Sequence, residues 1–135
     1  MTKSEHVEFG RRGERAAALY LRSCGWEIVE TNWRFEHGEI DLIGWRRERR
    51  YGAWCDVLNV VEVKTRRRAG SFRPEDAVGA RKRRTIVQGA TRYLQGWPCR
   101  QVSVRFDVIG VVWAGHLPQI THHAHAFTAE VPLNP

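Results

Sequence analysis

The sequence predicts an α/β protein with one mixed β-sheet flanked by helices. Three alternating, β-branched segments follow an Ala- and Leu-rich helical segment, and a second helical segment separates the third strand from a fourth. A helix between two strands favours a right-handed crossover joining parallel neighbours, whereas the first three strands are close enough for antiparallel hairpins. The predicted order is αβββαβ, with a short further strand near the C-terminus. At 135 residues, we expect a single domain over 1–135.

The first half of the chain supplies a helix and three strands. Residues 8–24 have a helical pattern, and Gly25 is well placed to end that helix. The alternating segments predict strands over 26–35, 39–45 and 56–64. The charged segment 46–54 is expected to be a hairpin tip.

The second half supplies another helix and the last strands. Pro74, followed by Glu75 and Asp76, suits the first turn of a helix, which is expected to run to Gln95 and end at Gly96. Further strands are expected over 102–113 and 119–127, and 128–135 is expected to be a loose tail.

The charge of the chain favours an anionic partner. Lys and Arg number 22 against 15 Asp and Glu, which gives a net charge of +7. Such a surface attracts polyanions, and nucleic acid is the leading candidate. Arg outnumbers Lys, and its guanidinium binds phosphates in a bidentate way. Simple solubility is the alternative explanation.

The same sequence predicts a cytoplasmic protein without a membrane segment. The three cysteines are scattered and show no paired spacing, so neither a disulfide framework nor a zinc site is expected. The N-terminus has no apolar core of signal-peptide length. No apolar stretch approaches the roughly 20 residues that span a bilayer.

The stretch VLNVVEVKTR (57–66) places charges on an otherwise apolar strand. Side chains alternate along a strand, so Glu62 and Lys64 share one face. Taken alone, they predict a salt bridge on a half-solvated strand. Asp41 lies within the preceding strand and, if the two strands pair antiparallel, can stand about 5 Å from Glu62 at Cβ. Two carboxylates that close repel unless a cation lies between them, and Mg²⁺ suits because it prefers oxygen ligands.

Glu14 is the second acid in an apolar setting. Its neighbours on one helical face are Ala17, Ala18 and Leu21. Such an acid must be paired, bound to a cation, or at the border of the apolar stripe. An ion pair with Arg11 or Arg15 and a role at the predicted cation site both remain open.

Asp41 followed by Glu62-Val63-Lys64 resembles the PD-(D/E)xK motif of restriction enzymes and archaeal Holliday-junction resolvases. The chain is also similar to the YraN-type family of small bacterial proteins, which are predicted endonucleases. The matching stretches are GRRGERAAALYL (10–21), NWRFEHGEIDLI (32–43), VVEVKTR (60–66), ATRYL (90–94) and VRFDVIGV (104–111).

The resemblance implies a restriction-endonuclease-like fold and a metal-dependent active site. Asp41 and Glu62 would hold Mg²⁺ or Mn²⁺, with the Val63 carbonyl completing the coordination. Lys64 would be the catalytic lysine, and Glu14 an additional group of the metal site. The implied activity is hydrolysis of phosphodiester bonds in DNA, including branched or damaged DNA, and a resolvase-like role requires a homodimer. The alternative is a non-catalytic nucleic-acid-binding protein that keeps the fold.

Basic residues around the site are expected to contact phosphates. Arg66, Arg67 and Arg68 follow the strand that carries Lys64, and Lys82 and Arg83 lie on the second helix. Lys82 is preferred because the family pattern carries a lysine there. For each group the alternative is a solvated surface.

Other polar and aromatic residues have structural explanations. Asp107 lies in an apolar strand and is expected to bond Arg105 or a neighbouring backbone group, although a catalytic role is the alternative. Trp54 at the hairpin tip is expected to pack at an edge, with stacking on an unpaired base as the alternative. The three late histidines are expected to be alternating strand residues rather than metal ligands: His122, His123 and His125.

Overall fold

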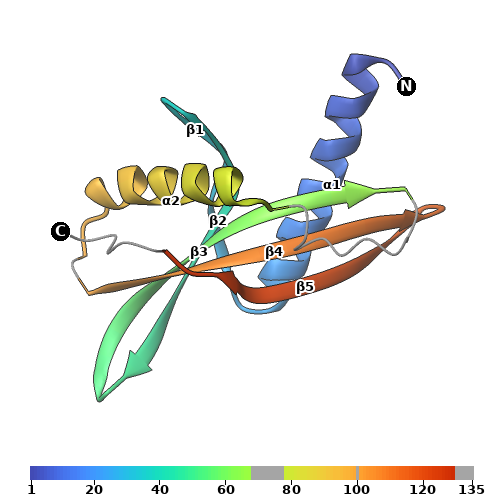
Figure 1. Ribbon diagram of the computed structural model, residues 1–135. Helices are drawn as coiled ribbons and strands as arrows, with labels where there is room; N and C mark the ends of the chain where they lie inside the picture. The colour runs from blue at the N-terminus through green and yellow to red at the C-terminus, as the bar shows by residue number, and fades with distance from the viewer. Residues whose placement is uncertain (68–77, 100, 130–135) are drawn as a thin grey trace.

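The computed structural model describes residues 1–67, 78–99 and 101–129 and contains one five-stranded mixed sheet with a helix on each face (Figure 1). Its elements, in chain order, are α1 (Lys3–Ser23), β1 (Glu27–Phe35), β2 (Gly38–Arg50), β3 (Ala53–Arg66), α2 (Ala80–Gln95), β4 (Val102–Ala114) and β5 (Leu117–Phe127). The strands lie in the order β1-β2-β3-β4-β5, and only the β3–β4 pair is parallel. The predicted element order, mixed sheet and additional last strand are therefore confirmed.

Helix α1 begins earlier than the predicted start at residue 8. Thr2 is its N-cap: the Thr2 hydroxyl accepts a hydrogen bond from the Glu5 amide, and the Glu5 carboxylate accepts one from the Thr2 amide. This capping box satisfies two amides that the helix leaves unbonded and so fixes the first turn. Within the described ranges, neither helix has the length and apolarity needed to cross a membrane.

Helix α2 begins later than predicted. Val78 and Gly79 are not helical, and Gly79 is the N-cap in an extended conformation with φ −72° and ψ 173°. Val78 is only 2% exposed because its side chain packs into the core. The chain therefore enters the helix from an extended segment. The predicted start at Pro74, with Glu75 and Asp76, lies outside the described residues, whereas the predicted end at Gln95 is confirmed.

The hairpin between β2 and β3 is much tighter than the predicted tip over 46–54. The strands pair as far as Arg50 with Ala53, leaving only Tyr51 and Gly52 as a turn. Both turn residues have positive φ, 53° and 78°, as a two-residue type I′ turn requires. That turn matches the twist of the strands and lets the charged segment continue as a β-ribbon, so the predicted hairpin is confirmed but its predicted tip over 46–54 was too long.

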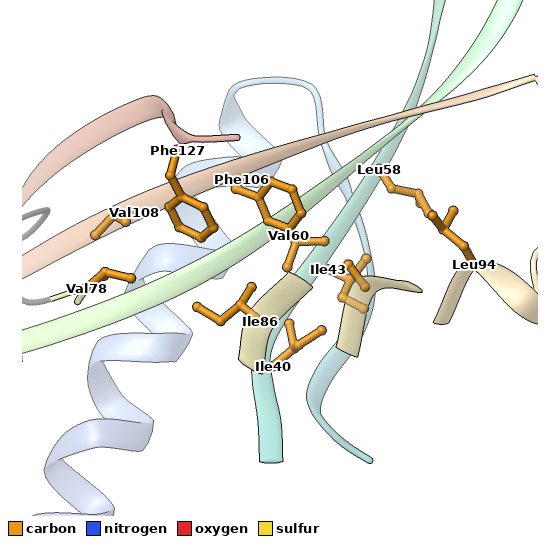
Figure 2. Packing of buried hydrophobic residues seen from close by; sticks show 11 residues of the cluster. Ile40, Ile43, Leu58, Val60, Val78, Ile86, Leu94, Phe106, Val108 and Phe127 are labelled. Carbon is orange, nitrogen blue, oxygen red and sulfur yellow. The ribbon is translucent and has the colours of Figure 1, made fainter. Parts of the chain in front are cut away.

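Two hydrophobic clusters lie on opposite faces of the sheet. On one face α2 packs Ile86 and Leu94 against the sheet residues Ile40, Leu58 and Val60. Figure 2 shows this cluster, whose labelled members are Ile40, Ile43, Leu58, Val60, Val78, Ile86, Leu94, Phe106, Val108 and Phe127. The opposite cluster joins α1 to the sheet through Ala17, Ala18, Leu21, Trp26, Leu42, Val57, Val61, Val63, Ile109 and Val111. The central strands β3 and β4 are thus buried on both faces, as parallel neighbours usually are.

Close backbone approach holds each helix against the sheet. A β-carbon at Gly13 would overlap the side chain of Thr65, near the end of β3. A β-carbon at Gly89 in α2 would likewise overlap the ring of Phe35. Glycine therefore lets α1 lie close to the end of β3, which places Glu14 in the same part of the molecule as Glu62 and Lys64.

Candidate functional site

The candidate site lies where β2 and β3 stop pairing. Leu42 opposite Val61 is the last backbone pair of this ladder in the direction of Asp41. One residue further on, the Asp41 carboxylate accepts a hydrogen bond from the Val63 amide at 2.8 Å. The Asp41 side chain thus takes the place of the backbone carbonyl that would accept from the Val63 amide if β2 and β3 continued to pair. The predicted antiparallel pairing is confirmed, and both acids follow directly after its last pair.

Glu62 is buried and lies between two lysines. It is 5% exposed, and its Oε1 lies 3.3 Å from the Nζ of Lys64 and 3.7 Å from the Nζ of Lys82. Lys64 is its neighbour on the same strand face, as predicted from the alternation of β3. Lys82 comes from the first turns of α2 and points at the acid, where sequence reasoning expected a phosphate contact.

The electrostatic environment of Asp41 favours its protonated form. Burial, followed by the negative charge of Glu62, raises the pKa of Asp41 to about 8. Glu14 raises it further, while the hydrogen bond from the Val63 amide and the charge of Lys82 act in the opposite direction. A nearby positive charge would stabilise the ionised form of Asp41. Carboxylates with pKa values raised in this way are enriched at functional sites.

Glu14 approaches the site from α1 and is held by two side chains. Its Oε2 accepts hydrogen bonds from Arg11 Nη1 at 3.0 Å and from Asn32 Nδ2 at 2.8 Å. The predicted pairing with Arg11 is confirmed, whereas Arg15 pairs with Glu8 at 2.8 Å. The charge of Glu14 nevertheless acts on Asp41, so the second prediction, a role at the acid site, stays open.

Asn32 is a site residue that sequence reasoning missed. It has φ 49°, in the left-handed region, within β1 and between the paired residues Thr31 and Trp33. Asparagine is among the few residues that tolerate this conformation. An Asn inside an alternating strand was the available signal, since it marks a local irregularity.

The predicted phosphate-binding arginines lie in different surroundings. Arg66 ends β3 and donates to the Thr65 carbonyl, and Arg67 lies with its guanidinium 5.1 Å from the centre of the Phe9 ring. Arg83 donates to the Val78 carbonyl at 2.8 Å and covers the ring of Phe127, so its side chain connects α2 to β5. Arg68 lies outside the described residues.

The residues at this site could hold a divalent cation with few protein ligands. In the described parts of the chain, no three His, Cys, Asp or Glu side chains gather closely enough to form a metal site by themselves. Mg²⁺, however, is commonly bound by one or two carboxylates together with water and substrate phosphate. Asp41 and Glu62 offer hard oxygen donors and repel each other, which fits such a cation. The expected contribution of the Val63 carbonyl stays a prediction.

Asp107 forms a separate polar centre, which is fully saturated by protein groups. Burial alone would raise its pKa, but hydrogen bonds from His122, Arg105, the His125 amide and Asn59 hold the pKa of Asp107 below its ordinary range. Arg105 binds both carboxylate oxygens, at 3.1 and 2.7 Å, and His122 Nε2 lies 2.6 Å from Oδ2. The predicted bond to Arg105 and the structural explanation are confirmed.

The fold and the site together define a class: a mixed α/β protein with two acids and two lysines at the end of its central hairpin. Residues 13–111 match the model of the uncharacterised protein family UPF0102. The chain belongs to this family. It is 40% identical to the UPF0102 protein of Rhodococcus jostii strain RHA1 over 92% of this chain and 99% of that one.

Relatives from other bacteria match over similar lengths. The UPF0102 protein of Myxococcus xanthus strain DK1622 is 35% identical over 93% of this chain and 94% of its own. That of Chlorobium chlorochromatii strain CaD3 is 43% identical over 91% of this chain and 86% of its own. The name of the family states no activity, so function has to be argued from the site.

Proposed function

We propose that this protein is a metal-dependent endonuclease that hydrolyses phosphodiester bonds in DNA. One observation carries the proposal: Asp41, Glu62 and Lys64 gather where β2 and β3 separate, and the first of these acids is held with a raised pKa. A lone salt bridge would need one acid and one base. The raised pKa of Asp41, caused by burial and by the charge of Glu62, instead favours a cation between the two acids, and the resemblance to the PD-(D/E)xK motif supports the same assignment.

In the proposed reaction, Asp41 and Glu62 hold the cation and Lys64 stabilises the reacting phosphate. When bound, Mg²⁺ or Mn²⁺ supplies charge neutralisation at the phosphate and lowers the pKa of an attacking water. The water oxygen would form the new bond to phosphorus as its proton passes to solvent, while the bond to the leaving sugar oxygen breaks and that oxygen takes a proton from solvent. Lys64 is placed to offset the negative charge that develops on the phosphate oxygens. It must turn from Glu62, 3.3 Å away, toward the substrate.

Glu14 and Lys82 have supporting roles in this proposal. Glu14, fixed by Arg11 and Asn32, adds negative charge at the site without a change of conformation. Lys82 Nζ lies 3.7 Å from Glu62 Oε1 and would help to position that buried carboxylate for a cation. Arg66 and Arg67 lie at the same end of β3, where they would contact phosphates flanking the cleaved bond. Cutting both strands of a duplex would require two such sites, hence a symmetric homodimer.

A specific observation favours a second candidate, a nucleic-acid-binding protein that does not cut. Both lysines pair with the same oxygen of Glu62, so protein groups already compensate part of the acidic charge. In that case the site would be a salt-bridge cluster, and the net charge of +7 would serve binding alone.

The decisive experiment incubates the protein with linear, nicked and four-way DNA in the presence of Mg²⁺ or Mn²⁺. We expect cleavage by the wild type and a loss of about 10²- to 10³-fold in Lys64→Met. Lys3→Met, the same substitution at an exposed position, is the control. Equal cleavage by Lys64→Met and the wild type would overturn the mechanism. Binding without cleavage of any of the three DNAs would favour the second candidate.

A further inference from the structure

The ribbon formed by residues 46–55 extends beyond the rest of the sheet (Figure 1). β1 pairs with β2 only as far as Trp45, and β4 pairs with β3 only from Asp56 onward. The ribbon therefore has no neighbouring strand on either side within the described residues. Four arginines and one glutamate lie on it, which gives it a positive charge.

The two faces of this ribbon have different surroundings. On the α1 side, Arg46 lies over the Trp26 ring and Arg50 donates to Ser103, so these arginines are engaged with the body of the protein. On the α2 side, Arg49 stands opposite Trp54 in the ladder, with its guanidinium 5.5 Å from the Trp54 ring centre. Trp54 is 57% exposed, and Tyr51 at the turn is fully exposed. Large aromatic side chains beside arginines, held out in solvent, are typical of surfaces that stack nucleic-acid bases.

Trp54 and the candidate site share one face of one strand. The pairing of β3 with β2 and with β4 continues without a register shift, so Trp54, Asp56 and Glu62 alternate onto the same face. Eight residues separate Trp54 from Glu62, which corresponds to about 26 Å along the strand. That span equals roughly eight base-pair steps of B-form DNA.

Helix α2 bridges this interval and carries no acidic residue. Its first turns contact the site through Lys82 and Glu62, and beyond its end Trp97 Nε1 donates to Asp56 at 3.0 Å. The helix therefore runs along β3 from the site toward the ribbon. Its outward stripe has helical spacing and is exposed throughout: Arg81, Arg84, Gln88, Arg92 and Gln95.

We propose that a DNA strand leaving the Asp41–Glu62 site follows the outer face of α2 and ends with an unpaired base stacked on Trp54. Arg81, Arg84 and Arg92 contact its phosphates, and Arg49 supports the stacked base. This inference rests on the proposed function for the identity of the polymer and narrows the substrate to DNA with unpaired bases about eight nucleotides from the cleaved bond. A general solubility function would account for the arginines but gives no role to an exposed Trp and Tyr.

The phosphate contacts are tested by the salt dependence of DNA binding. Fluorescence anisotropy with a labelled, tailed duplex in EDTA measures binding without cleavage. We expect Arg84→Gln/Arg92→Gln to reduce the slope of log K against log salt by about 1.4 to 1.8, which corresponds to two lost contacts. Arg15→Gln/Arg22→Gln removes two exposed charges from α1 and should leave the slope unchanged. Equal slopes for the two double variants would overturn the path along α2.

The stacking contact is tested with two DNAs that differ only in an unpaired tail of 12 nucleotides. Trp54→Ala should weaken binding of the tailed duplex about tenfold and binding of the blunt duplex less than twofold. Trp54→Phe keeps an aromatic face and should restore most of the affinity. Equal affinity of Trp54→Ala and wild type for the tailed duplex, or an equal loss on both DNAs, would overturn the stacked base.

These binding measurements can fail separately from the nuclease proposal. Cleavage by a wild type whose binding is insensitive to both sets of substitutions would leave the active site intact and remove the α2 path. Binding that depends on Arg84, Arg92 and Trp54, without cleavage in Mg²⁺ or Mn²⁺, would support the path and remove the nuclease.

Discussion

Asp41 and Asp107 occupy similar places in the sequence and opposite electrostatic environments in the structure. Each is an acid flanked by apolar residues within a strand. Asp107 is fully buried and receives hydrogen bonds from three side chains and one amide, which hold its pKa low. Asp41 receives one bond, from the Val63 amide, and its pKa is raised to about 8 by burial and by neighbouring acids.

The donors around each carboxylate separate a structural acid from a functional one. The partners of Asp107 provide all the positive charge and donors that its carboxylate can use, so no ligand is needed to explain it. Around Asp41 the protein adds negative charge instead, from Glu62 and Glu14. Acids placed this close together destabilise the fold. We propose that they are kept together because they bind a cation.

Removing the Asp107 carboxylate should destabilise the fold strongly. Asp107→Ala leaves Arg105 and His122 without their shared acceptor in the interior, and we expect a loss of about 3–5 kcal/mol in the free energy of unfolding. Urea denaturation measures this loss, with Asp41→Ala as the matched substitution, which removes one hydrogen bond and should lose about 1 kcal/mol. Similar losses in the two variants would remove the contrast between the two acids.

A divalent cation should stabilise the protein through Asp41. At a Mg²⁺ or Mn²⁺ concentration of 100 times Kd, we expect a gain of about 2.7 kcal/mol in the free energy of unfolding. Thermal unfolding at increasing metal concentration measures this gain. Asp41→Asn should abolish it, and Glu36→Gln, at a carboxylate that is 87% exposed, should not. A full gain in Asp41→Asn would show that the cation binds elsewhere.

The close approach of α1 should be sensitive to a single methyl group. Gly13→Ala overlaps Thr65, and we expect a loss of about 1–3 kcal/mol. Gly10→Ala, three residues earlier in the same helix, meets no atom within 4 Å and should gain about 0.5–1 kcal/mol. Chemical denaturation compares the pair directly. A neutral Gly13→Ala would mean that packing does not fix the distance between Glu14 and the site.

The raised pKa of Asp41 should also make the stability of the protein depend on pH. Without metal, folded Asp41 keeps its proton up to about pH 8, whereas the unfolded chain releases it near pH 4. The folded state therefore binds more protons in this interval, and stability falls as the pH rises. Three pH units at about 1.36 kcal/mol each give an upper limit of about 4 kcal/mol for the contribution of Asp41 between pH 5 and 8.

Comparing the wild type with Asp41→Asn isolates this contribution from those of other titrating groups. The variant should lose less stability than the wild type over the same interval, because the amide mimics the protonated acid. The two curves should become parallel when the wild type is saturated with Mg²⁺, because the cation replaces the proton and removes the pH dependence that Asp41 contributes. Parallel curves without metal would contradict the raised pKa.

Local sequence patterns were sufficient for the sheet but not for the ends of its elements. Alternation and β-branching predicted all five strands, because those signals depend on neighbouring residues. The start of α1 was missed because it depends on the reciprocal bonds of Thr2 and Glu5. The length of the hairpin was missed because charged residues 46–50 are compatible with a ribbon that has solvent on both faces.

In the candidate site, too, some residues could be predicted from local sequence patterns and others could not. Asp41, Glu62 and Lys64 could be predicted because spacing along two paired strands determines where they meet. The approach of Lys82 and the clamp of Asn32 on Glu14 depend on how helices pack on the sheet. The partners of Asp107 come from positions as distant as Asn59 and His122, so no local pattern could have indicated them.

The two-residue turn at Tyr51 and Gly52 makes the protruding ribbon adjustable. Adding two residues to each of its strands would keep the alternation of faces and lengthen the protrusion by about 7 Å, without disturbing the hydrophobic clusters. If Trp54 is the far anchor of a bound DNA strand, the hairpin acts as a molecular ruler. Homologues with longer or shorter hairpins would then hold the DNA strand at different distances from the same acidic site.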